Sequence, residues 1–495
     1  MTPLGIGVII ALVIFLGAGF GTYFLVKSSG KRFIIAGKQL PFFLVGTMLL
    51  AQSLDANATL GNAAGTYTTG FWAGFVFPLG LAICLVVVGI WFAKPLNRMN
   101  LITLPDFYFR RYNRLTEVIS SGLMTFSFLI LVAGNLAGAA WIMSVLFPIS
   151  LLTGLVIMAA VVFLYTTAGG LFACAATDIT QIYPAMLAFF AGVIWMLIAY
   201  GGWSYFAGSI PSEFTDLSGL TSVGNGALLN WAGILALGLG DVIALDFMER
   251  VFAAKSPETA RKSCFYGAGF TILIGLAAST MGMMAIKLLP DLADPRLALA
   301  TLATDVMPLA AGLFIMVGII AAGLSTADGG MLGVSAVFSR NILQRNVLKV
   351  WAKQHTHDER ASLDSKLLWV TRLMGIPVMA AAVALAIWKP EPGIMLVLAF
   401  DVVFAGLLVP LALGIYWKKA NTYGAMSAII VGSVLRIVLY WTIPLDLAGL
   451  DTLIPPVVSL LVMVPVSLMT QKQNPPKFEV IDETPDDDAV LSTLR

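Results

Sequence analysis

The chain contains few charged residues: only 11% of its 495 residues are Asp, Glu, Lys or Arg, whereas 59% are hydrophobic. Its three cysteines, Cys84, Cys174 and Cys264, are an odd and scattered set that implies no disulfide framework. Its two histidines, His355 and His357, share one polar loop, and no phosphate-binding G-x-x-x-x-G-K-[ST] motif occurs. These absences argue against metal or nucleophilic chemistry within a membrane and against an ATP-binding protein. The net charge of +2 gives no reason to expect a nucleic-acid partner.

Long hydrophobic runs recur along the chain. Each is long enough to cross a hydrocarbon core of roughly 30 Å as a helix, so we expect an all-α polytopic membrane protein with about 13 transmembrane helices. The first run continues past any small-residue cleavage site, and we expect it to remain in the protein as a helix. The expected spans are 4–27, 41–69, 71–97, 116–147, 150–172, 177–200, 230–252, 263–288, 306–342, 366–388, 393–417, 422–444 and 450–470.

The distribution of lysine and arginine predicts the orientation of these spans. Of the 29 Lys and Arg residues, Lys287, Arg296 and Lys389 fall in loops on one side, and Arg436 lies within a span. The other 25 (29 − 4) fall on the opposite side. Because positive charge collects in cytoplasmic loops, we expect the N-terminus outside and the C-terminus inside, in a plasma (inner) membrane.

The second span is unusually polar for a membrane helix. Its sequence, AQSLDANATLGNAAGTYTTG, places Gln52, Ser53, Asp55 and Asn57 at bilayer depth, with glycines close by. A helix that is locally unwound beside a cavity fits this pattern, because its freed carbonyls can then coordinate an ion or a solute. The alternative is a polar packing seam between helices.

A second polar group interrupts the ninth span. Ser325 and Asp328 are three residues apart and share a helix face, with Thr326 beside them. A carboxylate at this depth costs roughly 2.5–3.5 kcal/mol on insertion scales, so it must face protein, water or an ion. Two hydroxyls and a carboxylate form an all-oxygen cluster that suits a hard cation. Alternatively, the hydroxyls only bond back to carbonyls one turn earlier.

Five aspartates lie in or at the ends of spans, and no lysine or histidine lies there to neutralise them. Unpaired carboxylates in a membrane favour a bound or transported cation. Locally, Asp178 also fits a helix N-cap, and Glu249 and Arg250 are expected to form a surface pair at the inner face. The five are Asp55, Asp178, Asp241, Asp328 and Asp401.

Several separate motifs resemble the sodium:solute symporter family, and together they cover most of the chain. GGLFACAATDITQ (169–181) resembles its Gly-Gly-Leu…Thr-Asp-x-x-Gln segment. MERVFAAKS (248–256) resembles its Gln-Arg-x-x-Ala-Ala-Lys-Ser segment, with Glu249 where glutamine is usual. TLPDFYFRRY (103–112), AAGLSTADG (321–329) and LGIYWKKANTYGA (413–425) resemble three further stretches.

The resemblance implies a LeuT-like core of ten helices in two inverted repeats of five, with a broken first core helix. Core helices one to five would be the second to sixth spans, and core helices six to ten the seventh to eleventh. The domains would be an accessory N-terminal helix (1–40), core repeat 1 (41–200), an extracellular loop (201–229), core repeat 2 (230–420), two accessory helices (421–472) and a disordered acidic cytoplasmic tail (473–495).

The resemblance also implies a sodium site between the first and eighth core helices. Carried over to this chain, its ligands would be the carbonyls of Ser53, Ala56 and Ala322 and the hydroxyls of Ser325 and Thr326.

Some members of that family bind a second sodium through the Thr-Asp aspartate, here Asp178, and through serines where this chain has Asp328 and Gly329. Two carboxylates that face one pocket repel each other, so either one of them takes a proton or a cation lies between them. We expect a second cation site at Asp178, Ser325 and Asp328.

Asp55 and Asp241, on core helices one and six, are candidates for solute binding together with Gln52 and Asn57. Such a site would favour a solute with a cationic or strongly hydrogen-donating nitrogen. Alternatively, Asp55 points away from the cavity and stabilises the helix break. We therefore expect a monomeric, sodium-coupled symporter of a small polar solute, with sodium as the coupling ion and no organic cofactor. The alternatives are a transporter-like solute sensor and a proton-coupled symporter of the same fold.

Overall fold

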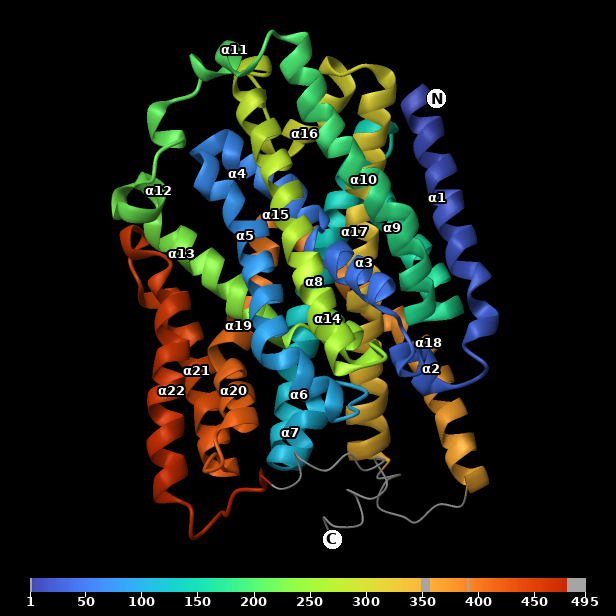
Figure 1. Cartoon of the computed structure of the whole chain (residues 1–495), viewed down its shortest axis with the longest axis vertical. Coiled ribbons are helices and arrows are strands. Elements are labelled where there is room, and N and C mark those ends of the chain that lie inside the picture. Colours follow the sequence, from blue (N-terminus) through green and yellow to red (C-terminus); the bar gives the residue numbers. More distant parts are fainter. Residues whose placement is uncertain (1, 349–356, 390, 479–495) are drawn as a thin grey trace.

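The computed structural model describes residues 2–348, 357–389 and 391–478. These residues form helices joined by loops, with no β-strand among them, and the long helices stand side by side in one tall bundle (Figure 1). Helices suit a membrane because each one satisfies its own backbone hydrogen bonds. Most of the predicted acidic tail (479–495) and His355 lie outside the described residues.

Within the described residues, ten helices are long and apolar enough to cross a membrane, and two bent helix pairs raise that number to twelve. The predicted count of 13 is therefore not confirmed. The span that is not counted is 41–69, because it is divided into a short apolar helix and a polar half. The ten are Pro3–Leu25, Phe71–Arg98, Arg114–Leu146, Leu151–Gly169, Leu171–Ala199, Pro257–Leu288, Leu309–Val347, Glu359–Trp388, Thr422–Thr442 and Leu450–Met469.

Many of these helices begin at a polar capping residue. The side chain of Asn113 accepts a hydrogen bond of 2.8 Å from the backbone N–H of Thr116, and Ser256 accepts one of 3.1 Å from Thr259. A side-chain oxygen at this position satisfies an N–H group that has no partner within the helix. The helices that begin at Asn113, Ser150, Ser256 and Asn421 are α8 (Arg114–Leu146), α9 (Leu151–Gly169), α15 (Pro257–Leu288) and α21 (Thr422–Thr442).

Three spans are interrupted. The first interruption separates α3 (Phe42–Ser53) from a π-helical turn (Asn57–Gly61) and α4 (Asn62–Thr69). The other two bend by 47° and 48° and were not predicted. They separate α13 (Ala227–Leu235) and its short continuation to Ile243 from α14 (Leu245–Ala253), and α19 (Pro392–Gly406) from α20 (Leu408–Tyr416).

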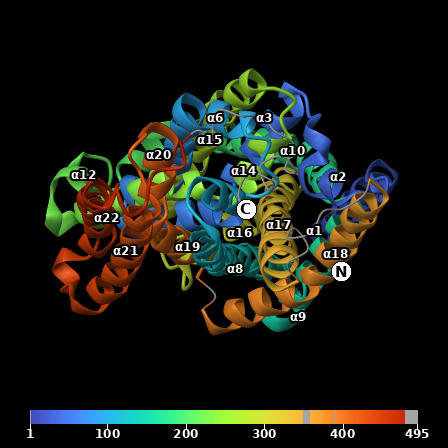
Figure 2. The same ribbon diagram turned by 90° about the horizontal axis from the view of Figure 1, so that it is seen from below.

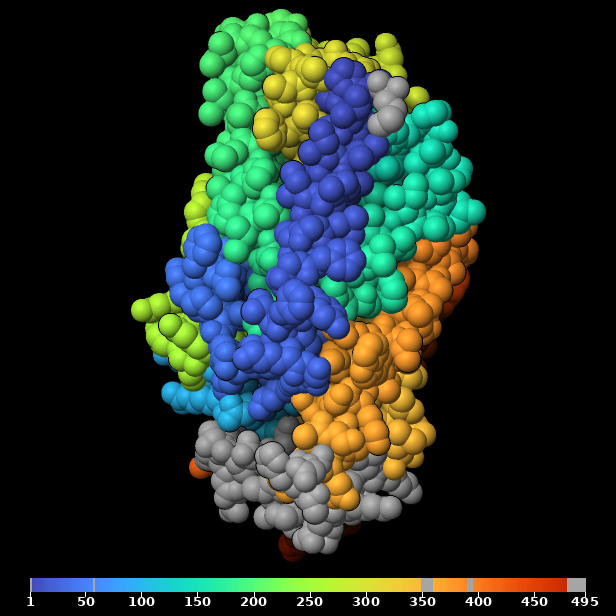
Figure 3. Space-filling model, turned by 90° about the vertical axis from the view of Figure 1, so that its right-hand side faces the viewer, coloured from blue at the N-terminus to red at the C-terminus, as the bar shows by residue number. Residues whose placement is uncertain are grey.

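The centre of the bundle is formed by α17 (Leu309–Val337), on which both α8 and α10 (Leu171–Ala199) pack, and by α15, which packs on α3 and α5 (Phe71–Val87). Helix α1 (Pro3–Gly21) lies on the outside against α9 and α10, and Figure 3 shows it running along that face. Helices α21 and α22 (Leu450–Met469) lie on the opposite side of the bundle (Figure 2).

A short buried helix, α7 (Pro105–Arg111), closes the lower end of the bundle. It is anchored to α20, because Arg111 Nε donates a 2.8 Å hydrogen bond to the Gly414 carbonyl. Asp106 accepts from Arg340 Nε at 3.0 Å and lies 2.9 Å from Arg345 Nη1. Burial alone would raise the pKa of Asp106, but the arginines outweigh it and hold that pKa below its usual value.

Candidate functional site

The break in the first core helix is held open by a carboxylate. Helix α3 ends at Ser53, and Leu54 has non-helical angles (φ −120°, ψ 59°). Asp55 Oδ1 accepts a 2.5 Å hydrogen bond from the Ala58 N–H, while Asn135 on α8 donates to Asp55 Oδ2 at 3.0 Å. Asn135 also accepts from the Ala56 N–H at 3.1 Å. Asp55 thus stabilises the break, as in the alternative that the sequence left open.

The predicted sodium ligands on α17 lie against this break. The Ser325 hydroxyl bonds to the Ala322 carbonyl at 2.9 Å and lies 3.4 Å from the Ala51 carbonyl at the end of α3. The Thr326 hydroxyl is buried without a hydrogen-bond partner. Gly323 allows the close approach, because a Cβ there would lie 3.1 Å from the Ala56 Cβ.

Together these contacts place the end of α3, whose last carbonyls lack partners within the helix, beside the Ser325 hydroxyl of α17. The Ser53 hydroxyl bonds to the Leu50 carbonyl at 2.9 Å and to Thr271 on α15, while its carbonyl is the group that the sequence proposes as a sodium ligand. An all-oxygen set of carbonyls and hydroxyls suits a hard monovalent cation.

The four candidate solute residues have different surroundings. Gln52 is engaged elsewhere, since its Nε2 donates a 2.6 Å hydrogen bond to the Ser325 carbonyl. Asp55 caps the break, and the side chain of Asn57 lies outside the described part of the structure. Asp241 is only 2% exposed and lies at the second break, where Ala244 is extended (ψ 126°). The carboxylates of Asp55 and Asp246 lie near it.

The second predicted cation site lies next to the guanidinium of Arg250, which the sequence analysis did not place there. Asp178 is not an N-cap: α9 and α10 are separated only by Gly170, so Asp178 lies two turns inside α10. Asp328 accepts a 2.8 Å hydrogen bond from Tyr165, and its other oxygen lies 3.8 Å from Arg250 Nη2. Both Asp178 oxygens are buried without a hydrogen-bond partner.

The prediction that Glu249 and Arg250 form a surface pair is wrong. Their side chains are 4% and 0% exposed, because α14 is packed between α3 and α17. The expectation that the membrane aspartates are unpaired is wrong for Asp401 as well. Arg436 on α21 donates to Asp401 at 2.7 Å and lies 3.0 Å from Asp451.

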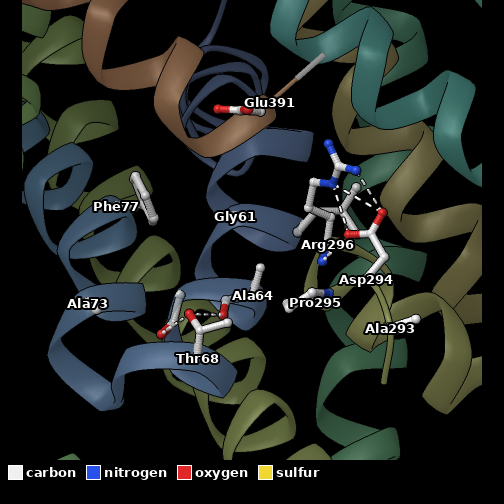
Figure 4. Close-up of a pocket in the computed structure, with 12 residues that line it drawn as sticks. Gly61, Ala64, Thr68, Ala73, Phe77, Ala293, Asp294, Pro295, Arg296 and Glu391 are labelled. Carbon is white, nitrogen blue, oxygen red and sulfur yellow. Dashed lines mark hydrogen bonds and ion pairs between the residues drawn. The ribbon is translucent and has the colours of Figure 1, made fainter. Parts of the chain in front are cut away.

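A cavity of about 640 Å³ lies beside α4, the second half of the broken helix (Figure 4). It is lined on one side by Gly61, Ala64 and Thr68 and on the other by a charged segment. In that segment Arg296 binds both carboxylate oxygens of Asp294, with Nε and Nη2 contacts of 2.8 Å. The remaining lining residues include Phe77 and Glu391. The Lys and Arg bias predicts that Arg296, and with it this cavity, lies on the outer side of the membrane.

Comparison with known proteins decides which family this geometry belongs to. The sequence model of the sodium:solute symporter family matches residues 33–432, which is most of the chain. The chain belongs to the sodium:solute symporter family. This confirms the resemblance found in the sequence motifs.

Among the relatives of this symporter-family chain, the human high affinity choline transporter 1 is 23% identical over 464 residues, covering 87% of this chain and 76% of the relative. A sodium/proline symporter of Staphylococcus aureus (strain NCTC 8325 / PS 47) is 26% identical over 482 residues, covering 92% and 90%. These relatives are transporters rather than enzymes.

Solved structures confirm the LeuT-like fold class. A Na⁺-coupled sialic acid symporter superposes with a TM-score of 0.77 at 16% identity, covering 95% of this chain and 98% of the other. The nucleobase-cation-symport-1 family transporter Mhp1 superposes with a TM-score of 0.58 at 14% identity, covering 94% and 98%. At these identities the likeness establishes the fold alone.

Proposed function

We propose that this multi-pass membrane protein is a secondary active transporter that couples the inward movement of sodium to the uptake of a small polar solute. The observation that carries the proposal is the contact of Ser325 with the broken end of α3, next to the buried Thr326 hydroxyl that has no hydrogen-bond partner. The first sodium would be held there by the carbonyls of Ser53, Ala56 and Ala322 and by the two hydroxyls. One charge moving down 100 mV supplies about 2.3 kcal/mol, enough for roughly fiftyfold accumulation of a solute.

We propose Asp241 as the residue that contacts the solute. It lies at the break of core helix six, whereas Gln52 and Asp55 are already engaged by Ser325 and by the Ala58 N–H. A buried carboxylate of this kind favours a solute with a positively charged or strongly donating nitrogen. Choline and proline, which the names of two relatives specify, both carry a charged nitrogen.

The cavity beside α4 would be the extracellular route to the solute site, with the N-terminus outside and the C-terminus in the cytoplasm. The transporter would act as a monomer in a plasma (inner) membrane. A proton-coupled symporter is the second candidate, because Asp178, Glu249 and Asp328 are buried carboxylates that could carry protons.

The experiment that tests the proposal has two stages. Purified protein is first heated with amino acids, amines, urea, carboxylates and vitamins, each with sodium and with potassium. Solutes whose stabilisation requires sodium are then followed in proteoliposomes that carry an inward sodium gradient. Uptake that collapses when the gradient is dissipated supports sodium symport. Uptake driven by a pH gradient without sodium supports proton coupling, and sodium-dependent binding without uptake supports a sensor.

A further inference from the structure

Arg250 is a fully buried arginine that faces several carboxylates from different helices. Its side chain is 0% exposed, and its Nη1 donates a 3.1 Å hydrogen bond to the Asp246 carbonyl within α14. Nη2 lies 3.8 Å from Asp328 on α17, and Nη1 lies 3.7 Å from Glu249. A buried guanidinium is costly unless it is paired, so this placement needs an explanation in function or folding.

The position of Gly329 creates the space that Arg250 occupies. A Cβ at this position would lie 2.8 Å from Arg250 Nη1 and 2.8 Å from Gln52 Oε1. The guanidinium and the Gln52 amide oxygen therefore both lie directly beside Gly329. The Nε2 of the same amide donates a hydrogen bond of 2.6 Å to the Ser325 carbonyl. A short chain of polar groups thus runs from the proposed first sodium site through Gln52 to Arg250.

The contacts around Arg250 are loose. Its Nε and Nη2 have no hydrogen-bond partner, and neither do Glu249, Asp178, the Oδ1 of Asp328 or the Oε1 of Gln52. Donors and acceptors that face each other at 3.7–3.8 Å can form hydrogen bonds after a movement of about 1 Å, because such bonds are 2.7–3.2 Å long. The cluster is therefore poised to exchange partners when α14 shifts against α10 and α17.

We propose that Arg250 is a positioning residue that fastens α14, the inner half of core helix six, to α17. Gln52 transmits the occupancy of the first sodium site to this contact. A sodium ion that fixes Ser325 also fixes Gln52, whose Oε1 then holds the guanidinium in place and keeps the inner half of the bundle closed. This inference rests on the proposed function, since it assigns a role in coupling to a residue that does not touch sodium.

The charged and titratable groups that face Arg250 come from each neighbouring helix. Asp246 and Glu249 are on α14 itself, Asp178 and Cys174 are on α10, Asp328 is on α17 and Tyr165 is on α9. One guanidinium does not balance so many carboxylates. A second cation or protons between Asp178 and Asp328 are therefore compatible with this role of Arg250.

Cys174 provides a direct readout of this contact, because its buried thiol lies within hydrogen-bonding reach of the Asp328 carboxylate. Replacing Cys84 and Cys264 by alanine leaves Cys174 as the only thiol. In this background we expect sodium to slow the reaction of Cys174 with a small thiol reagent by about tenfold, within the usual range of coupling between two sites. The variants Arg250→Gln and Gln52→Leu should abolish this protection, while Arg250→Lys should retain part of it.

The surface pair of Lys94 and Glu258, which is 36% and 48% exposed, provides the control, because Lys94→Gln removes a cation without touching the cluster. Should Arg250→Gln not fold, the double variant Arg250→Gln, Asp328→Asn removes both charges and should fold without sodium protection. Sodium stabilisation against heat is measured in parallel. If sodium binds but Arg250→Gln keeps normal protection, the role of Arg250 is contradicted. If sodium does not bind even to the background protein, the proposed function itself fails.

Discussion

Asp401 and Asp328 each face a buried arginine from another helix, and the two pairs differ in geometry. Asp401 and Arg436 join core helix ten to an accessory helix through a 2.7 Å hydrogen bond, and Asp451 lies 3.0 Å from the same guanidinium. Asp328 and Arg250 join two core helices at 3.8 Å, which is beyond hydrogen-bonding distance. Both pairs are buried, so exposure does not distinguish them.

The difference teaches which pair maintains the fold and which one can move. A tight buried pair costs several kcal/mol to break, because the partner that remains is an uncompensated charge. A loose pair loses less when it separates, which suits helices that shift against each other during alternating access. We therefore assign Asp401 to the fold and Asp328 to coupling.

The largest expected effect is the loss of the tight pair. Asp401→Asn should destabilise the protein by about 3 kcal/mol, because Arg436 is left with Asp451 alone. Thermal unfolding in mild detergent and the yield of folded protein measure this loss, with the exposed Asp446→Asn as the control. A variant as stable as the control would show that the two pairs do not differ in the way proposed.

A smaller effect is expected from filling the space of the loose pair. Gly329→Ala places a Cβ 2.8 Å from both Arg250 and Gln52 and should cost about 1–3 kcal/mol through overpacking. It should also weaken sodium activation of transport. Gly122→Ala on α8 is the matched control, because nothing lies within 4 Å of its Cβ. Equal sodium activation in both variants would show that the space at Gly329 does not contribute to sodium coupling.

Asp241 sharpens the comparison as a third buried aspartate, one that lies near the carboxylates of Asp55 and Asp246. Asp241→Asn keeps the shape of the side chain and removes its charge. For a cationic solute, we expect the apparent dissociation constant to rise about tenfold, equivalent to 1.4 kcal/mol, while sodium affinity changes little. Isothermal titration with the solute found by screening measures this, and unchanged solute affinity would place Asp241 in a structural or gating role.

The smallest expected effect is a change of one in the number of charges that move with each solute. If a second cation lies between Asp178 and Asp328, Asp328→Ala should move one charge fewer per solute and show less steep sodium activation. If a proton lies there instead, Asp328→Asn should transport normally and lose its pH dependence. Uptake and current recorded together on proteoliposomes between pH 5 and 8 distinguish these outcomes. Asp328 is only a structural partner if stoichiometry, steepness and pH response all stay unchanged.

Titration of Asp106 does not contribute to the pH response measured in that experiment. Its pKa in the folded protein lies below the unfolded value, so the stability it contributes is present above the unfolded pKa. That stability is lost only as the pH falls through the lowered folded pKa, well below pH 5. A response between pH 5 and 8 therefore does not come from Asp106 itself.

The sequence predicted the features that depend on local composition. The polar residues at 52–57 marked the break in core helix one, and the oxygen cluster at 325–328 marked the helix that faces it. The break in core helix six was missed, although two glycines precede Asp241, because a short apolar run does not reveal an extended residue such as Ala244.

The arginine partners were missed for a different reason. Arg250 lies near the inner end of a span, where lysine and arginine usually reach water. Its burial results from contacts between α14, α3 and α17, which are distant in sequence. The pairing of Arg436 with Asp401 likewise depends on how α21 packs on α19. Such pairings follow from tertiary packing, and the spacing of one sequence does not contain them.

The central claim is that the coupling sodium is bound by Ser325 and Thr326 at the broken end of α3. The most direct measurement is the sodium dependence of solute uptake in proteoliposomes for the double variant Ser325→Ala, Thr326→Ala. Ser335→Ala, which removes another buried hydroxyl from α17, is the control. We expect half-maximal sodium activation to require at least about tenfold more sodium in the double variant, with similar amounts of folded protein. Sodium activation equal to that of the control would contradict the claim.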